Sequence, residues 1–196
     1  MMKLLTILAN SAAILVLFCM SAAAQQSVLR CDPAQTKAGI VLNGNFHTVH
    51  GTWAFKRGEL RFDLATSAIG GELVFDAASG KTGNDTRDKK MNKDVLETDR
   101  YPEITFRPSH VDGKVAAQGA STVQVKGMFG IHGSEREITV PAEVKFDGEH
   151  WSTSVHFTVP YAKWGMKNPS VLFLRVQDTV EVEFNAGGSR SPVTAR

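Results

Sequence analysis

Cysteine is scarce in this chain of 196 residues, which has only Cys19 and Cys31. Cys19 lies in an N-terminal apolar segment that we expect to be removed, so the mature chain keeps Cys31 alone. A single thiol cannot form an internal disulfide, so the fold must be held together by its core. We interpret Cys31 as a half-buried small apolar residue near a chain end, in preference to a redox group.

The chain also lacks a strong charge of either sign. Without Lys3 in the N-terminal segment, 21 basic residues face 20 acidic ones, and no run of Lys and Arg is interleaved with aromatic residues. Surfaces that bind nucleic acids are basic, so we predict no nucleic-acid partner.

Sequence signatures of common enzymes and metal sites are missing as well. No G-x-S-x-G, G-x-G-x-x-G, P-loop or HExxH motif occurs. His47 and His50 are three residues apart, which places them on opposite faces of a strand, so a two-histidine clamp would need a bulge or turn between them. We predict no metal site and no catalytic residue.

One long apolar run is present, from Leu4 to Met20, and it has the features of a secretory signal. Lys3 precedes it and Ser21-Ala22-Ala23-Ala24 follows as a small-residue cleavage site. We expect residues 1–24 to be a signal peptide. A lipoprotein is disfavoured because the bulky Phe18 precedes Cys19. No other stretch is apolar enough to span a bilayer, so we expect no stable membrane span after cleavage.

The rest of the chain alternates apolar and polar residues with a period of two, which indicates antiparallel strands with one apolar face. The segment from Glu137 to Phe146 is a clear example. Lys56-Arg57-Gly58-Glu59 is typical of a hairpin turn. We predict an all-β domain over residues 25–186, with a flexible tail over 187–196. Eight to ten strands could form a barrel or a sandwich, and periodicity does not choose between them.

The stretch 83–106 is the one convincing helix candidate. Asn84 or Asp85 can cap it, and Met91, Val95 and Leu96 form a narrow apolar stripe that would anchor it to one end of the sheet. Arg87 and Asp88 are adjacent, so a helix points them about 100° apart. We interpret them as a solvated face or a structural ion pair in preference to catalytic groups.

A second irregular stretch, 159–170, contains Pro, Gly and large rings. It is typical of an ordered loop that packs Trp164 and Met166 over one end of a barrel. The alternative is that these two side chains line the mouth of a ligand site.

Several short motifs, in this order along the chain, resemble the YceI-like family of periplasmic, polyisoprenoid-binding, lipocalin-like proteins. They are Phe46-His47-Thr48-Val49-His50-Gly51, Thr82-Gly83-Asn84 with Arg87-Asp88 and Met91, Val95-Leu96-Glu97, Tyr101-Pro102-Glu103-Ile104-Thr105-Phe106, Val125-Lys126-Gly127 to Ile131-His132-Gly133, and Val159-Pro160-Tyr161 with Trp164-Gly165. One departure is Ser134-Glu135-Arg136-Glu137 after the glycine, where many relatives have another His or a Thr-Arg/Lys-Pro run.

The resemblance implies an antiparallel lipocalin-like barrel of about eight strands with one inserted α-helix, exported to the periplasm. It also implies a bound isoprenoid quinone, polyprenyl phosphate or fatty amide, with no other cofactor. We expect the ligand to contact large apolar side chains, namely Phe46, Trp53, Phe55, Phe62, Phe106, Phe129, Phe157, Trp164 and Met166.

Two other functions remain open at this point. The first is a lipid-modifying or redox-linked enzyme that uses Arg87, Asp88, His47 and His50. The second is a stress or scaffold protein without a ligand, which should show an exposed apolar patch or a dimer seam in place of a cavity. A homodimer is compatible with the binding function too.

Overall fold

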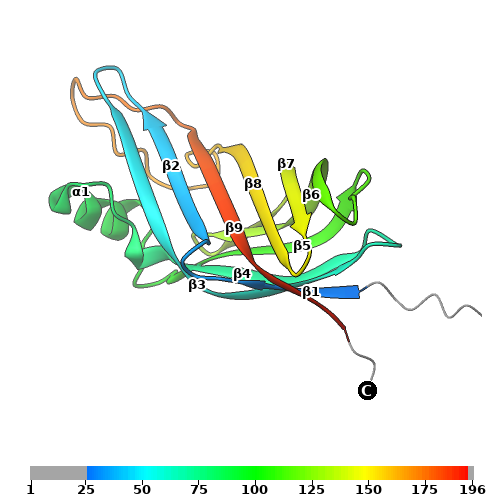
Figure 1. Cartoon of the computed structure of the whole chain (residues 1–196). Coiled ribbons are helices and arrows are strands. Elements are labelled where there is room, and N and C mark those ends of the chain that lie inside the picture. Colours follow the sequence, from blue (N-terminus) through cyan, green and yellow to red (C-terminus); the bar gives the residue numbers. More distant parts are fainter. Residues whose placement is uncertain (1–25, 194–196) are drawn as a thin grey trace, which may run out of the picture.

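The computed structural model describes residues 26–193, so the expected signal peptide lies outside the described residues. This part of the chain is built almost entirely from strands (Figure 1). Their bounds are β1 Gln26–Cys31, β2 Lys37–Asn43, β3 Thr48–Asp63, β4 Ile69–Asp76, β5 Glu103–Asp112, β6 Gly119–Ile131, β7 Ser134–Asp147, β8 His150–Val159 and β9 Val180–Pro192. The helical segments are η1 Ala77–Ser79, α1 Asp85–Lys90 and η2 Met91–Val95.

The nine strands occupy eight positions in a closed antiparallel barrel. Sheet order is β1-β3-β2-β9-β8-β7-β6-β5-β4, and pairing between β3 and β4 closes the ring. β2 lies between one half of β3 and one half of β9, and β1 lies between their other halves, so β1 and β2 share a single position. The predicted barrel of about eight strands with one inserted helix is therefore confirmed, and the sandwich is excluded.

The period-two pattern places apolar side chains inside the barrel. In β7, Val140, Ala142 and Phe146 are buried, whereas Glu143 and Lys145 between them are exposed. The same alternation in the neighbouring strands gives one continuous apolar interior and a polar outer surface.

The expected hairpin at Lys56-Arg57-Gly58-Glu59 is wrong, because β3 continues through it as one strand of 16 residues. Its pairing with β4 shifts register between Phe55 and Arg57, as a β-bulge does. Lys56 and Arg57 both bond to Glu103 of β5. The charged residues that suggest a turn are thus the outward side chains of a bent strand.

The expected C-terminal tail is also corrected, because β9 extends to Pro192. Residues 188–192 pair with β1, and residues 187–189 pair with β8. The small residues that suggest flexibility instead allow close approach of strands. At Gly188, φ is +156°, and a Cβ atom would collide with the carbonyl oxygen of Arg30. Residues 194–196 lie outside the described part of the chain.

The predicted helix is present but short, and it changes type. The side chain of Asn84 caps α1 by accepting a hydrogen bond from the Arg87 backbone N–H at 2.9 Å. From Met91 the chain continues as the π-helical turn η2. Figure 1 shows α1 at one end of the barrel. No helix within residues 26–193 is long and apolar enough to cross a membrane.

Candidate functional site

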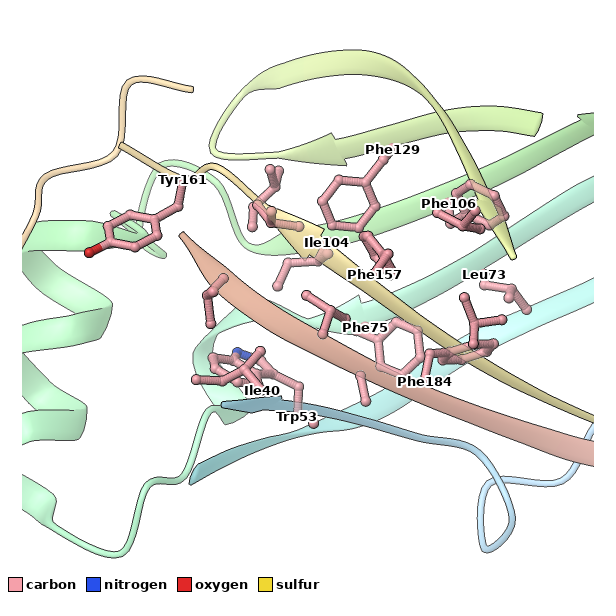
Figure 2. A pocket seen from close by; sticks show the side chains of 18 of the residues that line it. Ile40, Trp53, Leu73, Phe75, Ile104, Phe106, Phe129, Phe157, Tyr161 and Phe184 are labelled. Carbon is pink, nitrogen blue, oxygen red and sulfur yellow. The ribbon is translucent and has the colours of Figure 1, made fainter. Parts of the chain in front are cut away.

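The barrel encloses a cavity of about 670 Å³. Inward side chains from all nine strands line it, and nearly all of them are aliphatic or aromatic. Figure 2 shows some of these side chains, including Ile40, Leu73, Phe75, Phe129 and Phe184, around the apolar space. The volume lies within the range of about 300–1,000 Å³ that is usual for small-molecule sites.

Edge-to-face aromatic pairs shape the walls of this cavity. The ring centroids of Phe129 and Phe157 are 5.8 Å apart, as are those of Phe75 and Phe184. Each pair joins side chains from different strands across the barrel interior, so the rings hold one another in place. The aromatic wall is therefore preformed.

One end of the cavity is plugged. Phe146 and Trp151, on either side of the turn between β7 and β8, are 1% and 4% exposed. The Arg190 guanidinium lies 4.2 Å above the Phe146 ring, and Trp151 Nε1–H donates to the carbonyl of Arg30 at 3.1 Å. A ligand cannot enter between these packed groups.

The opposite end reaches the surface between two connecting segments, residues 44–47 and 160–179. Several residues of the two segments line the cavity: His47, Pro169, Val171, Leu174 and Val176. Val171 and Leu174 are also 47% and 48% exposed, so the cavity is open beside them. We call these two segments the mouth loops; Figure 1 shows them side by side beyond the ends of β2 and β9.

Hydrogen bonds join the mouth loops to each other. The Asn45 backbone N–H donates to the Arg175 carbonyl at 3.0 Å, and the Asn45 side-chain amide donates to the Phe173 carbonyl at 2.9 Å. The Gln177 N–H donates to the Asn43 carbonyl at 2.9 Å. The mouth is thus a connected structure and not two separate loops.

Tyr161 joins the two ends of the longer mouth loop. Its ring lines the cavity, and its hydroxyl donates to the Gln177 carbonyl at 2.6 Å. Burial raises the pKa of Tyr161 to about 12, with a smaller contribution from the negative charge of Asp178. The phenol therefore stays neutral and acts as a hydrogen-bond donor at physiological pH.

Polar groups near the cavity are concentrated at α1. Thr82, Asn84, Thr86, Arg87 and Lys90 all line it on this side. Arg87 Nε–H donates to the Thr82 hydroxyl at 2.7 Å, and its Nη2–H donates to the Thr82 carbonyl at 2.6 Å. Among the described residues, Lys90 makes no ion pair with a carboxylate.

Six of the nine predicted ligand-contact residues line the cavity: Trp53, Phe62, Phe106, Phe129, Phe157 and Met166. They come from four strands and the longer mouth loop, so closure of the barrel brings them together. Their contact with a ligand stays a prediction.

The other three lie elsewhere. Phe46 is 73% exposed at the tip of the shorter mouth loop. Phe55, beside the bulge in β3, packs edge-on against Phe75 with 5.6 Å between ring centroids. Trp164 lies 5.9 Å from Phe129 and under the Arg136 guanidinium, so it covers the barrel from outside the cavity lining.

The sequence interpretation missed most of the wall, because it passed over all of the aliphatic side chains and some of the aromatic ones. Ile40, Leu73, Ile104 and Val140 line the cavity, and so do Phe75 and Phe184. They occupy the apolar positions of the alternating strands, which point into the barrel, and this pattern would have predicted them.

The four candidate catalytic residues do not form one site. Asp88 is 4% exposed and accepts bonds from the Thr82 N–H at 2.9 Å and the Thr82 hydroxyl at 2.5 Å, and these bonds lower its pKa. His47 and His50 are exposed, and no hydrogen bond within residues 26–193 joins either one to Arg87 or Asp88. Asp88 is therefore tied to Thr82 just before α1, whereas Arg87 also lines the cavity. No cluster of three or more His, Cys, Asp or Glu side chains suited to a metal ion occurs in the described part of the chain.

A closed antiparallel barrel with an apolar cavity open at one end defines a class of proteins that enclose small ligands, of which the lipocalins are the best-known example. Within this broad class the chain belongs to the YceI-like domain family, whose model matches residues 29–187. The resemblance that the sequence motifs indicated is thereby confirmed.

Two solved structures share this fold. One is BcnA of Burkholderia cenocepacia, with 23% sequence identity and a TM-score of 0.69; the aligned region covers 81% of this chain and 99% of the BcnA chain. Another is a polyisoprenoid binding domain from Saccharophagus degradans implicated in plant cell wall breakdown, with 19% sequence identity and a TM-score of 0.63. The aligned region covers 86% of this chain and 99% of that domain. No curated protein sequence matches the chain significantly.

Proposed function

We propose that this protein binds and carries a long-chain apolar molecule inside its barrel, and that it is not an enzyme. The observation that carries the proposal is the cavity of about 670 Å³, which is plugged at one end, open at the other and lined by apolar side chains from every strand. The ligand classes that we propose are isoprenoid quinones, polyprenyl phosphates and fatty amides. The Saccharophagus degradans relative, described as a polyisoprenoid binding domain, supports this choice.

Burial of apolar surface is sufficient to drive such binding. Transfer of apolar area from water is worth about 25 cal/mol per Å², so enclosing about 300 Å² of a hydrocarbon chain contributes about 7 kcal/mol. The cost of immobilising the ligand reduces this gain, but the preformed aromatic wall limits further reorganisation of the protein.

The distribution of polar groups orients the ligand. The plugged end around Phe146 and Trp151 offers only packed apolar surface to a hydrocarbon tail. Arg87 and Lys90 of α1, together with His47, offer hydrogen-bond donors at the polar side of the cavity. We therefore place the tail toward Phe146 and a polar head group near α1, and a phosphate head would gain most from the two cations.

We further propose that residues 1–24 direct export and that the mature domain acts in the periplasm. Its support is the pattern of Lys3, the apolar run and the small residues up to Ala24. Fractionation of cells that express the full chain, with N-terminal sequencing of the recovered protein, should place it in the periplasm with Gln25 first. Recovery of uncleaved protein in the cytoplasm would refute the export proposal.

The binding proposal is tested by extracting the protein purified from its native compartment and identifying the extract by mass spectrometry. We expect one apolar molecule at near-stoichiometric amount. The variant Ala142→Phe introduces a ring into the cavity from β7 and should remove the ligand. Its matched control is Glu143→Phe, which places the same ring on the exposed face of the same strand and should keep the ligand. Equal ligand content in both variants would contradict the proposal.

A further inference from the structure

The mouth loops carry most of the exposed large hydrophobic residues in the described part of the chain. Five of the six large hydrophobic residues that are exposed within residues 26–193 lie there: Phe46, Val171, Leu172, Phe173 and Leu174. We call these five residues the mouth patch. Single exposed apolar residues are ordinary on protein surfaces, but a group gathered at one place indicates a contact surface.

The mouth patch is held in a defined shape. Val171 and Leu174 exchange two backbone hydrogen bonds, of 3.0 and 2.8 Å, which close a tight turn with Leu172 and Phe173 at its tip. Leu172 has φ of +45°, a backbone region in which glycine or asparagine is usual. The turn thus presents two large apolar side chains, 90% and 83% exposed, where a small residue would fit the backbone better.

Side chains at the base of the turn hold it within the longer mouth loop. The Asn168 amide donates to Asp178 Oδ1 at 2.7 Å, and the Ser170 hydroxyl accepts from the Val176 N–H at 3.0 Å. The bond from Asn45 to the Phe173 carbonyl brings Phe46 to the same end. The two mouth loops therefore project from the barrel together (Figure 1).

The charged residues next to the mouth patch in the sequence are basic. Residues 43–48 and 167–177 contain Lys167 and Arg175 and no Asp or Glu. The next carboxylate, Asp178, accepts the hydrogen bond from Asn168 at the base of the turn. The side chains of Lys167 and Arg175 are both exposed. Apolar side chains bordered by cations are the combination that inserts into the interface of a membrane with anionic lipids.

We propose that the mouth patch docks onto the surface of an anionic lipid bilayer, with Leu172 and Phe173 inserted among the lipids and Lys167 and Arg175 against the head groups. Val171 and Leu174 belong both to the patch and to the cavity wall. An apolar path therefore continues from the bilayer into the barrel, and a lipid could move along it without exposure of its chain to water. This use of the surface rests on the proposed carrier function, whereas docking itself does not require a bound ligand.

Docking is tested by co-sedimentation of the purified protein with vesicles of phosphatidylethanolamine and phosphatidylglycerol, and with vesicles of phosphatidylcholine alone. We expect binding to the anionic vesicles that weakens as salt is added. The variant L172S/F173S should bind about tenfold or more weakly, since it loses the inserted apolar surface. The variant K167Q/R175Q should lose about fivefold per charge for anionic vesicles only. V193S, which alters an exposed apolar residue outside the patch, is the matched control and should bind as the wild type does.

Insertion is measured separately by tryptophan fluorescence, with the variant Phe173→Trp and vesicles whose acyl chains carry bromine. Bromine quenches the fluorescence of a tryptophan that lies at the depth of the acyl chains. The fluorescence of the added tryptophan should be quenched, after correction for the three native tryptophans measured in the wild type. Absence of vesicle binding by the wild type, or equal binding by L172S/F173S, would overturn the docking proposal. A concentration-dependent dimer that L172S/F173S abolishes, without vesicle binding, would also overturn it and assign the patch to a second copy of the chain.

These outcomes are distinct from failure of the carrier function. A protein that extracts with a stoichiometric ligand but binds no vesicle refutes the docking proposal alone. A protein that binds vesicles through the mouth patch but contains no ligand refutes the carrier proposal alone.

Discussion

Glu103 shows how single residues hold the bent strand β3 in place. Its carboxylate accepts bonds from Lys56 Nζ at 2.9 Å and Arg57 Nη1 at 2.7 Å, across the sheet from β5. The bond from Arg57 is the main reason that the pKa of Glu103 falls to about 2, followed by the bond from Lys56. The local sequence around Lys56 resembles a turn because this partner is 46 residues away from Arg57.

The ion pair predicts a specific acid sensitivity. The folded pKa of Glu103 lies below its ordinary value of 4.5, so the carboxylate stabilises the fold above pH 4.5 and loses this effect as the pH falls from 4.5 to about 2. Glu103→Gln should lower stability at pH 7 and flatten the pH dependence in this window, as measured by urea unfolding at several pH values. Glu137→Gln, which removes the exposed partner of Lys126, is the control. An unchanged pH profile for Glu103→Gln would contradict the prediction.

Cys31 provides a second prediction at the residue scale. Burial raises the pKa of its thiol to about 11, and the nearby Thr36 side chain offsets this only in part. At pH 8 the reactive thiolate is therefore rare, and we expect Cys31 to react with a thiol reagent such as Ellman's reagent far more slowly than a free cysteine does. Unfolding in guanidinium should restore the ordinary rate. Rapid reaction in the folded protein would contradict the assignment of Cys31 as a structural residue.

At the scale of elements, the segment from α1 to η2 forms a wall of the cavity. Its first turn follows local rules, since Asn84 caps it and Asp85 and Asp88 lie in its first turn. The change to a π-helical turn at Met91 does not follow from local rules. It accompanies contacts with other elements: the side chains of Met91 and Trp53 both lie against Gly80, and Leu96 is 8% exposed in the core.

This segment predicts a change in ligand exchange. Met91→Ala shortens a half-buried side chain of the cavity wall, so it should speed ligand release and cost about 1 kcal/mol of stability. Lys89→Ala, on the exposed face of the same segment, should change neither quantity. Transfer of a fluorescent fatty amide to acceptor vesicles measures release, and urea unfolding measures stability. Equal release rates for both variants would show that this wall does not control exchange.

At the scale of the whole molecule, closure of the barrel determines that a cavity exists. Eight strand positions close through the pairing of β3 with β4, and one of them is shared by β1 and β2. β1 supports the plugged half, where Leu29 is buried, and β2 supports the half that leads to the mouth. The interior is therefore filled by its own side chains at one end and open to a ligand at the other.

An unfilled cavity predicts that the ligand stabilises the whole fold. Ligand present at about 100 times its Kd should add about 2.7 kcal/mol. For a chain of this size the thermal midpoint should rise by about 5–10 °C over the lipid-free protein. Ala142→Phe fills part of the cavity, so its lipid-free form should melt no lower than that of the wild type, and added ligand should not raise its midpoint. Calorimetry of both proteins, before and after lipid extraction, measures the thermal midpoint. A ligand-dependent rise in the midpoint of Ala142→Phe would contradict the placement of the ligand in the cavity.

Local sequence was sufficient to predict the strands, the capped helix and the apolar side of each strand. The reason is that alternation and capping act between residues a few positions apart. The inward set in β7, Val140, Ala142 and Phe146, could be predicted from alternation alone. The resemblance to the YceI-like family was needed to predict a barrel in preference to a sandwich. Local sequence was misleading at Lys56 to Glu59 and beyond Gly187, where charged or small residues lie within strands because distant partners, Glu103 and Arg30, meet them.

Only the tertiary structure decided which side chains surround the cavity and which cover it from outside. Phe129 and Trp164 are both large aromatic residues next to the barrel, yet one lines the cavity and the other packs behind it. Phe46 belongs to a family motif, yet it is exposed beside Phe173, which is more than 120 residues away. The physical reason is that a cavity and a surface patch depend on closure, register and the balance of side-chain volumes around the whole barrel, and residues far apart in sequence set these together.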